Sequence, residues 1–314
     1  MNDITRSREM DFYDSRRILT LSVLSVVYIL VSYWLVGFRP EQFVLIFLFN
    51  TLYFISAPTR KFILGFSIFI VYWIIFDYMK AFPNFNYSSV RIESLYEAEK
   101  KIFGINSSGV RVTPNEYWLV HGNQFLDVLA GFFYLTWIPV PLIFGTFLFY
   151  TNKKLFYHFS LSFFLVNVLG FIIYYTYPAA PPWYVQQYGF HFYPSTAGST
   201  AGLAKFDSFF HTDIFKSIYQ KSSNVFAAMP SLHSSYPLIV LYFGIKNKMG
   251  KINLLFAAIM IGIWFAAIYT SHHYILDILA GILCGVAGIL LFNLLLSKSK
   301  FLNDWIDQLI RKTS

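Results

Sequence analysis

Two short polar segments interrupt an otherwise apolar sequence, and both contain histidine. In residues 269–277 (YTSHHYILD), His273 and Asp277 are four positions apart, so on a helix they share one face. The carboxylate can accept one ring N–H and leave the other ring nitrogen free to act as a base or a nucleophile. Taken alone, such a pair is more often an ion pair at a helix end or a pair of metal ligands.

The second segment, residues 229–235 (MPSLHSS), places His233 close to the expected start of a helix. Pro230 and Ser231 are a helix-start signal, and the free N–H groups and the dipole at such a start favour an anion. His233 alone would be an ordinary interfacial histidine. Two histidines and one acid beside a helix N-terminus suit phosphoryl transfer, in which one histidine attacks phosphorus and the acid orients it. The other histidine protonates the departing oxygen.

A zinc site is the alternative for the same group of side chains, namely His233, His272, His273 and Asp277. The sequence has no HExxH motif, however, and two adjacent histidines on a helix point to different faces. The single cysteine, Cys284, lies inside an apolar run, which excludes a cysteine-based metal site. We therefore predict chemistry that uses no metal and no cofactor.

The composition indicates the environment of these segments. Of the 314 residues, 56% are hydrophobic and only 13% are charged, whereas soluble domains carry about 25% charged residues. This excludes an ordinary cytosolic enzyme and a disordered chain. The formal net charge of +8 is diluted by aromatic and aliphatic residues, which indicates the flanks of membrane spans rather than a surface that binds nucleic acid.

Eight stretches are apolar and close to the length of about 20 residues that a helix needs to cross a bilayer. They are residues 18–38, 42–57, 62–79, 125–150, 155–177, 231–246, 252–270 and 273–296. The second and the sixth are short, so each could be tilted, interfacial or re-entrant. In none of them do apolar and polar residues alternate with period two, and this excludes a transmembrane β-barrel. The predicted fold is an all-α, polytopic transmembrane helical bundle of about eight spans.

Basic residues in the short connections predict the orientation of these spans. With eight spans, five basic clusters fall on one side of the membrane: Arg6, Arg8, Arg16 and Arg17; Arg60 and Lys61; Lys153 and Lys154; Lys246, Lys248 and Lys251; and Lys298, Lys300, Arg311 and Lys312. That side, with both termini, is predicted to be cytoplasmic. The long loops 80–124 and 178–230, and both histidine segments, then belong to the opposite face.

The histidine segments also resemble known signature motifs. PSLHS (230–234) and HHYILD (272–277) resemble the second and third motifs of the type 2 phosphatidic acid phosphatase (PAP2) superfamily, and more closely those of its inositol phosphorylceramide synthase branch. YPAAPPW (177–183) resembles the proline-rich first motif of that branch, and NQFLD (123–127) and GLAKFD (202–207) resemble other segments of it. The resemblance covers residues 115–290 and implies a PAP2-like helical core.

The resemblance also suggests a division of the chain. Residues 1–114 would form N-terminal membrane spans and an outer loop, and residues 115–297 would form a catalytic membrane core. Residues 298–314 would be a basic cytoplasmic tail. We expect a bacterial inner membrane with a periplasmic active site, with a Golgi-type membrane and a lumenal site as the alternative.

Carried over by motif position, the resemblance implies that His273 is the nucleophile, Asp277 its orienting partner and His233 the general acid and base. It implies an integral-membrane synthase that transfers phosphoinositol from an inositol phospholipid to the primary hydroxyl of a ceramide through a phosphohistidine. The partners would be these two lipids and the bilayer, and no cofactor is needed. Ceramide, dihydroceramide, diacylglycerol and a glycan lipid all remain open as the acceptor.

The sequence departs from the wider superfamily where phosphate would bind. The arginine expected six residues before the nucleophile is Ala267 here, and the first motif lacks its usual lysine and arginine. This weakens the assignment as a general phosphatase. The candidates for binding phosphate are Ser231 with its neighbouring amides, His272 and Lys205.

Three further residues are candidates for contact with the head group: Asp77, Asp127 and Trp183. Each has an ordinary alternative. Asp77 could pair with Lys80, Asp127 could lie at a helix N-terminus, and tryptophan is common at a membrane interface.

Two other functions remain open. A lipid phosphate phosphatase would use the same three catalytic residues with water as the second nucleophile. A non-enzymatic transporter or assembly factor would use the polar residues for structure only.

Overall fold

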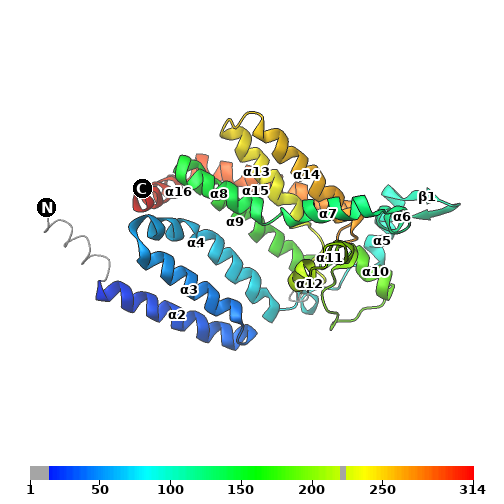
Figure 1. Cartoon of the computed structure of the whole chain (residues 1–314), viewed down its shortest axis with the longest axis horizontal. Coiled ribbons are helices and arrows are strands. Elements are labelled where there is room, and N and C mark those ends of the chain that lie inside the picture. The colour runs from blue at the N-terminus through cyan, green and yellow to red at the C-terminus, as the bar shows by residue number, and fades with distance from the viewer. Residues whose placement is uncertain (1–13, 220–223) are drawn as a thin grey trace. The chain divides into compact units, whose positions relative to one another are not determined.

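The computed structural model describes residues 14–219 and 224–314, which form two compact units. Of the described residues, one unit comprises residues 14–82 and Asp304–Ser314, and the other comprises residues 83–219 and 224–303. Figure 1 shows that both are built almost entirely from helices. The basic residues Arg6 and Arg8, which contribute to the predicted orientation, lie outside the described residues.

The first unit contains three apolar helices, α2 (Ser15–Val36), α3 (Pro40–Ile55) and α4 (Ala57–Tyr78), followed by the 3-10 helix η1 (Met79–Ala81). The side chain of Asp14 accepts the N–H of Arg16 at the start of α2, and Ser56 accepts the N–H of Thr59 at the start of α4. The hydroxyls of Ser32 and Tyr78 lie 2.8 Å apart and join α2 to α4. Hydrogen bonds of this kind between helices provide partners for polar side chains that the hydrocarbon of a bilayer cannot provide.

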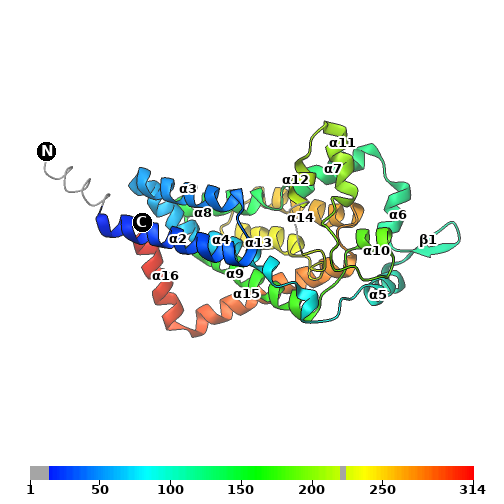
Figure 2. The same ribbon diagram turned by 90° about the horizontal axis from the view of Figure 1, so that it is seen from below.

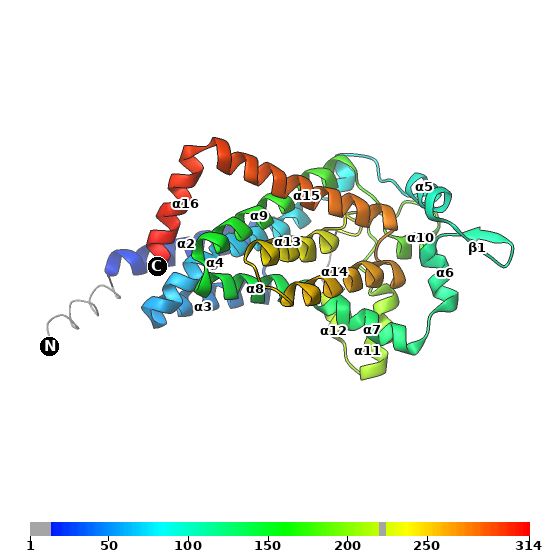
Figure 3. The ribbon, with the colours of Figure 1, turned by 90° about the horizontal axis from the view of Figure 1, so that it is seen from above.

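The second unit is built around six long helical segments. They are α7 (Gln124–Leu135), α8 (Pro139–Thr151), α9 (Lys153–Thr176), α13 (Leu232–Lys246), α14 (Ile252–Tyr269) and α15 (Ile275–Lys298). Proline begins α8, and the side chain of Asn152 caps α9 by accepting the N–H of Leu155. Helix α13 packs against α9, α14 and α15, and in Figure 3 it lies between α14 and α15.

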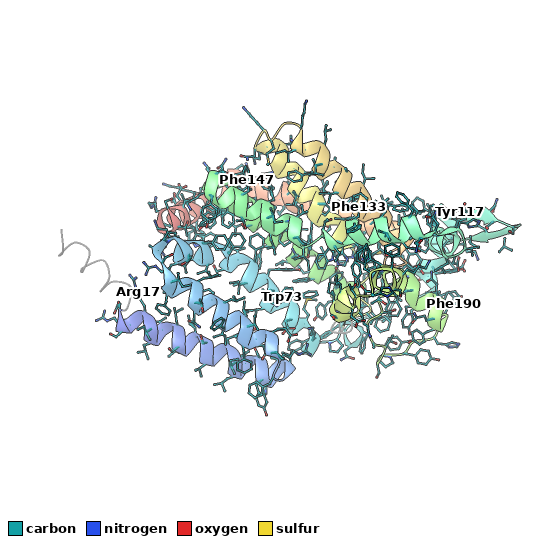
Figure 4. All side chains as sticks on the ribbon, viewed as in Figure 1. Arg17, Trp73, Tyr117, Phe133, Phe147 and Phe190 are labelled. Carbon is teal, nitrogen blue, oxygen red and sulfur yellow. The ribbon has the colours of Figure 1, made fainter. Side chains whose placement is uncertain are left out.

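Small residues let these helices approach closely, as is common between membrane helices. A Cβ at Gly262 of α14 would lie 2.2 Å from the ring of Phe133, the residue labelled on α7 in Figure 4. A Cβ at Gly288 of α15 would lie 2.4 Å from Val166 of α9. Mid-span Asn167 accepts a hydrogen bond of 2.6 Å from the hydroxyl of Tyr236, so it joins α9 to α13.

Shorter elements gather at one end of this second unit (Figure 2). They are η2 (Asn84–Asn86), α5 (Glu93–Phe103), the strands β1 (Ile105–Ser107) and β2 (Val110–Val112), α6 (Pro114–His121), α10 (Pro182–Tyr188), η3 (Ala201–Leu203), α11 (Ala204–Phe210) and α12 (Ile214–Tyr219). The two strands pair antiparallel, with Ile105 opposite Val112. Among the described residues, the departures from an all-α fold are this small hairpin and two isolated bridges, from Ala179 to Arg91 and to Ala227.

Each of the eight predicted spans coincides with a helix or a helix pair. Six described segments are long and apolar enough to cross a membrane: Ser15–Val36, Ala57–Ala81, Gln124–Thr151, Lys153–Thr176, Ile252–Tyr269 and Ile275–Lys298. The other two are the short spans of the prediction, α3 with 16 residues and α13 with 15. The last helix, α16 (Lys300–Thr313), follows α15 after Ser299.

Candidate active site

The start of α13 is held against α15 by backbone contacts. The amide of Ser231 donates a 2.9 Å hydrogen bond to the carbonyl of Asp277. Gly281 makes the approach possible, because a Cβ there would lie 2.1 Å from the carbonyl oxygen of Ser231. The segment that contains His233 is therefore fixed beside the helix that contains Asp277.

The turn between α14 and α15 positions the other two histidines. The amides of His272 and His273 both donate to the carbonyl of Ala267 at 3.0 Å. The side-chain amide of Asn115 donates to the carbonyls of Ile268 and His273 at 2.8 and 2.9 Å. These hydrogen bonds fix the backbone of the turn between α14 and α15, and so fix the positions from which the side chains of His272 and His273 extend.

The structure brings His233, His273 and Asp277 together in a row in which His233 is half-buried and the other two are buried. Nδ1 of His233 lies 3.1 Å from Nε2 of His273, and Nδ1 of His273 lies 3.6 Å from Oδ2 of Asp277. The second distance exceeds that of a hydrogen bond, as catalytic contacts often do before substrate is present. His273 is only 5% exposed, and Asp277 is fully buried.

This geometry assigns the protons. Because an aspartate oxygen faces Nδ1 of His273, the proton of the neutral ring belongs on Nδ1, and Nε2 keeps its lone pair. Nδ1 of His233 must then donate in its contact with His273. The 3.1 Å between these nitrogens leaves no space for another group between them, so a group bonded to Nε2 of His273 would require the two rings to separate.

The electrostatics favour a nucleophilic His273. Burial lowers the pKa of His273 from its ordinary 6.5 to about 4, and a hydrogen bond with the backbone of Ala228 opposes this only in part. The ring is therefore neutral near pH 7, the state in which a ring nitrogen can attack phosphorus.

Two of the candidate phosphate ligands are engaged with protein groups. The Ser231 amide is already bonded to Asp277, and the Ser234 amide donates to the Ser231 carbonyl at 3.1 Å. Among the described residues, the amides of Leu232 and His233 are therefore the free donors of this helix start. Lys205 is half exposed, and its ammonium lies 3.4 Å from the carboxylate of Asp127. Asp127 also accepts a 2.7 Å hydrogen bond from the hydroxyl of Tyr269.

Of the other two head-group candidates, Asp77 pairs with lysine as its ordinary alternative supposes, whereas Trp183 is buried in the protein. Asp77 belongs to the first compact unit and forms a 2.7 Å ion pair with Lys80. Trp183 is buried in a cluster with Tyr184 and Phe226, and its backbone N–H donates to the carbonyl of Ser271 at 3.0 Å. Trp183 thus ties the proline-rich segment to the turn that precedes His272.

Sequence reasoning missed Glu99 and Tyr134. Glu99 of α5 is fully buried and accepts the N–H groups of Ile275 and Leu276 at 2.9 and 3.1 Å, so it caps α15. Tyr134 of α7 is also fully buried, and its hydroxyl lies 3.3 Å from Nδ1 of His233. Glu99 lies in a charged loop segment and Tyr134 in an apolar run, so neither stood out from its neighbours.

Ala267 occupies the position at which the resemblance to the wider superfamily leads one to expect an arginine. It is fully buried, within the cluster that includes Tyr134, Phe206 and Ile278. No cation can replace it without displacing this cluster. Among the described residues, no three His, Cys, Asp or Glu side chains are grouped as metal ligands.

Comparisons with known proteins give a consistent result. A sequence model of the PAP2 superfamily matches residues 111–291. A phosphoinositol dihydroceramide synthase of Bacteroides thetaiotaomicron is 41% identical over 292 residues, which cover 92% of this chain and 96% of that protein. The inositol phosphorylceramide synthase catalytic subunit AUR1 of Saccharomyces cerevisiae is 28% identical over 242 residues, 74% of this chain and 56% of the yeast protein. No solved structure matches the chain.

Proposed function

The chain belongs to the PAP2 superfamily, and on that basis we propose that it is an integral-membrane phosphosphingolipid synthase. It transfers phosphoinositol from an inositol phospholipid to the primary hydroxyl of a ceramide-type lipid. The identity to the Bacteroides synthase, which extends over almost the whole of both chains, supports the substrate class. Residues 115–297 are its catalytic core.

The observation that supports this function most directly is the row from His233 to Asp277. Nε2 of His273 attacks the phosphorus of the donor, the N–P bond forms and the P–O bond to diacylglycerol breaks. His233, as the imidazolium beside the anionic phosphate, gives a proton to the departing oxygen and becomes neutral. The carboxylate of Asp277 stabilises the positive charge that develops on the ring of His273.

The second half of the reaction reverses these roles. His233 takes the proton from the primary hydroxyl of the ceramide, whose oxygen attacks phosphorus as the N–P bond breaks. The first-turn amides of α13 and the positive end of its dipole are suited to the phosphate oxygens throughout. No other reactant is needed for the atoms and protons to balance.

The test uses the purified protein with phosphatidylinositol labelled in its inositol ring, with and without ceramide. We expect a labelled phosphoinositol ceramide that forms only when ceramide is present, and its loss in His273→Ala and His233→Ala. His191→Ala is a matched control, because His191 is an exposed histidine of the loop 178–230.

Two outcomes would contradict the proposal. Release of inositol phosphate at a rate that ceramide does not change would indicate a phosphatase. Folded His273→Ala and His233→Ala variants that keep full activity in cells, measured by lipid mass spectrometry, would indicate a non-enzymatic protein.

A further inference from the structure

His272 has no part in the proposed transfer steps, yet it is buried among the groups that perform them. It is only 5% exposed. The centre of its ring lies 5.2 Å from that of Tyr134 and 4.6 Å from that of Tyr219. Because the hydroxyl of Tyr134 also contacts His233, His272 lies next to the reacting groups.

The hydrogen bonds of Thr270 determine which nitrogen of His272 carries the proton. The Thr270 hydroxyl donates its proton to the carbonyl of Ala266 at 2.7 Å. Its oxygen can therefore only accept from Nδ1 of His272, 3.2 Å away, and the Thr270 carbonyl, also at 3.2 Å, can only accept as well. Nδ1 must be the donor to both.

Nε2 of the same ring is left as an acceptor without a partner. It is buried, and no protein group of the described residues bonds to it. Burial and the neighbouring His273 lower the pKa of His272 to about 3, so the ring is neutral near pH 7 and Nε2 has a lone pair rather than a proton. The expectation that His272 binds phosphate therefore needs revision, because a lone pair repels a phosphate oxygen.

We propose that Nε2 of His272 accepts a hydrogen bond from a hydroxyl group of a lipid substrate. This proposal rests on the proposed function, which supplies two such lipids. Phosphodiester and ester oxygens only accept hydrogen bonds, whereas the inositol ring and the ceramide backbone both offer hydroxyl donors. A buried acceptor without a partner discriminates strongly against a substrate that lacks the matching hydroxyl.

The experiment measures kcat/KM for donors that lack single inositol hydroxyls and for acceptors that lack the ceramide hydroxyl that does not react. In the wild type we expect one of these analogues to lose roughly tenfold in kcat/KM relative to the complete lipid. A loss with a donor analogue assigns the contact to the head group, and a loss with the acceptor analogue assigns it to the ceramide.

His272→Phe keeps an aromatic ring between Tyr134 and Tyr219 but removes the acceptor. We expect it to lose about tenfold with the complete lipid and to lose nothing further with the analogue that the wild type rejects. His272→Gln, which restores an acceptor, should regain part of the discrimination. His191→Phe, at an exposed position, should behave as the wild type.

The inference and the proposed function fail in different ways. If the wild type makes no phosphoinositol lipid, the proposed function is wrong. If it is active but accepts every analogue equally, or if His272→Phe keeps the discrimination of the wild type, the function stands and the role of His272 is overturned. Even if both variants fail to fold, equal use of every analogue by the wild type overturns the role of His272.

Discussion

At the scale of single residues, the proposed role of His273 as nucleophile requires an unprotonated ring, and burial favours that state. Removing an imidazole from water disfavours its charged form. The buried carboxylate of Asp277 faces Nδ1, which keeps the one proton of the neutral ring away from Nε2. Burial thus favours the neutral state of the His273 ring, and the facing carboxylate of Asp277 determines which ring nitrogen carries its proton.

This predicts an unusual acid limb for the formation of the phosphohistidine. Because the pKa of His273 is lowered to about 4, the nucleophile stays unprotonated down to that pH, and the step should slow only as the pH falls through it. Single-turnover rates in detergent from about pH 4 to pH 8 would measure this, with thermal stability recorded over the same range. A limb centred near the ordinary value of about 6.5 would contradict the assignment.

At the scale of secondary-structure elements, the row of His233, His273 and Asp277, which we propose to be catalytic, depends on how α15 begins. Two different carboxylates satisfy the first N–H groups of this helix. Asp277 accepts the N–H of Tyr274 at 2.8 Å, and Glu99 of α5 accepts those of Ile275 and Leu276. A loop helix distant in sequence therefore helps to position the residue that faces His273.

We expect Glu99→Ala to destabilise the protein by about 1–2 kcal/mol, because the lost cap leaves two N–H groups unpaired. Synthase activity should fall as the start of α15 loosens. Glu97→Ala is the matched control, since Glu97 is on the same helix but exposed, and it should change neither quantity. Thermal unfolding in detergent and a lipid synthesis assay would measure both, and equal behaviour of the two variants would refute the capping role.

The close approach of α13 to α15 makes a second prediction. In Gly281→Ala the new Cβ would lie 2.1 Å from the Ser231 carbonyl, so α13 must move away and His233 with it. A displacement of about 1 Å can cost roughly 100-fold in rate. In Gly285→Ala, one turn later, the new Cβ meets the flexible side chain of Leu238 at 3.1 Å and Ser235 at ordinary contact distances of 3.4 and 3.6 Å. This variant should stay within about threefold of the wild type. Initial rates would test this, and similar rates for the two variants would contradict it.

The sequence predicts those parts of the molecule for which a physical requirement leaves a local pattern in the chain, such as an apolar stretch of a given length or a spacing between motif residues. Apolar length predicts the spans, because a bilayer requires it, and the motif spacing identifies the three residues that the fold brings together. Glu99, Asn115 and Tyr134 could not be predicted in this way. Their roles come from contacts between segments far apart in the chain, such as that from Asn115 to Ile268 and His273, and no local pattern records such contacts.

At the scale of the whole molecule, the distribution of basic residues predicts on which side of the membrane the histidines lie. The basic clusters belong to the short connections, such as Lys251 between α13 and α14, whereas the histidines lie at the other ends of these helices. Basic connections stay in the cytoplasm. We therefore propose that the active site opens on the periplasmic or lumenal face and that both termini are cytoplasmic.

Cysteine labelling would test this orientation, because Cys284 is the only native cysteine and is buried. In a Cys284→Ser background, single cysteines replace Ser195 of the outer loop and Lys251 of the connection, both exposed positions. A membrane-impermeant maleimide applied to intact spheroplasts should label Ser195→Cys only, and detergent should make Lys251→Cys reactive as well. The reverse order of labelling would contradict the proposal, because it would place the histidines on the cytoplasmic side. Both lipid substrates would then have to reach the site from the cytoplasmic leaflet.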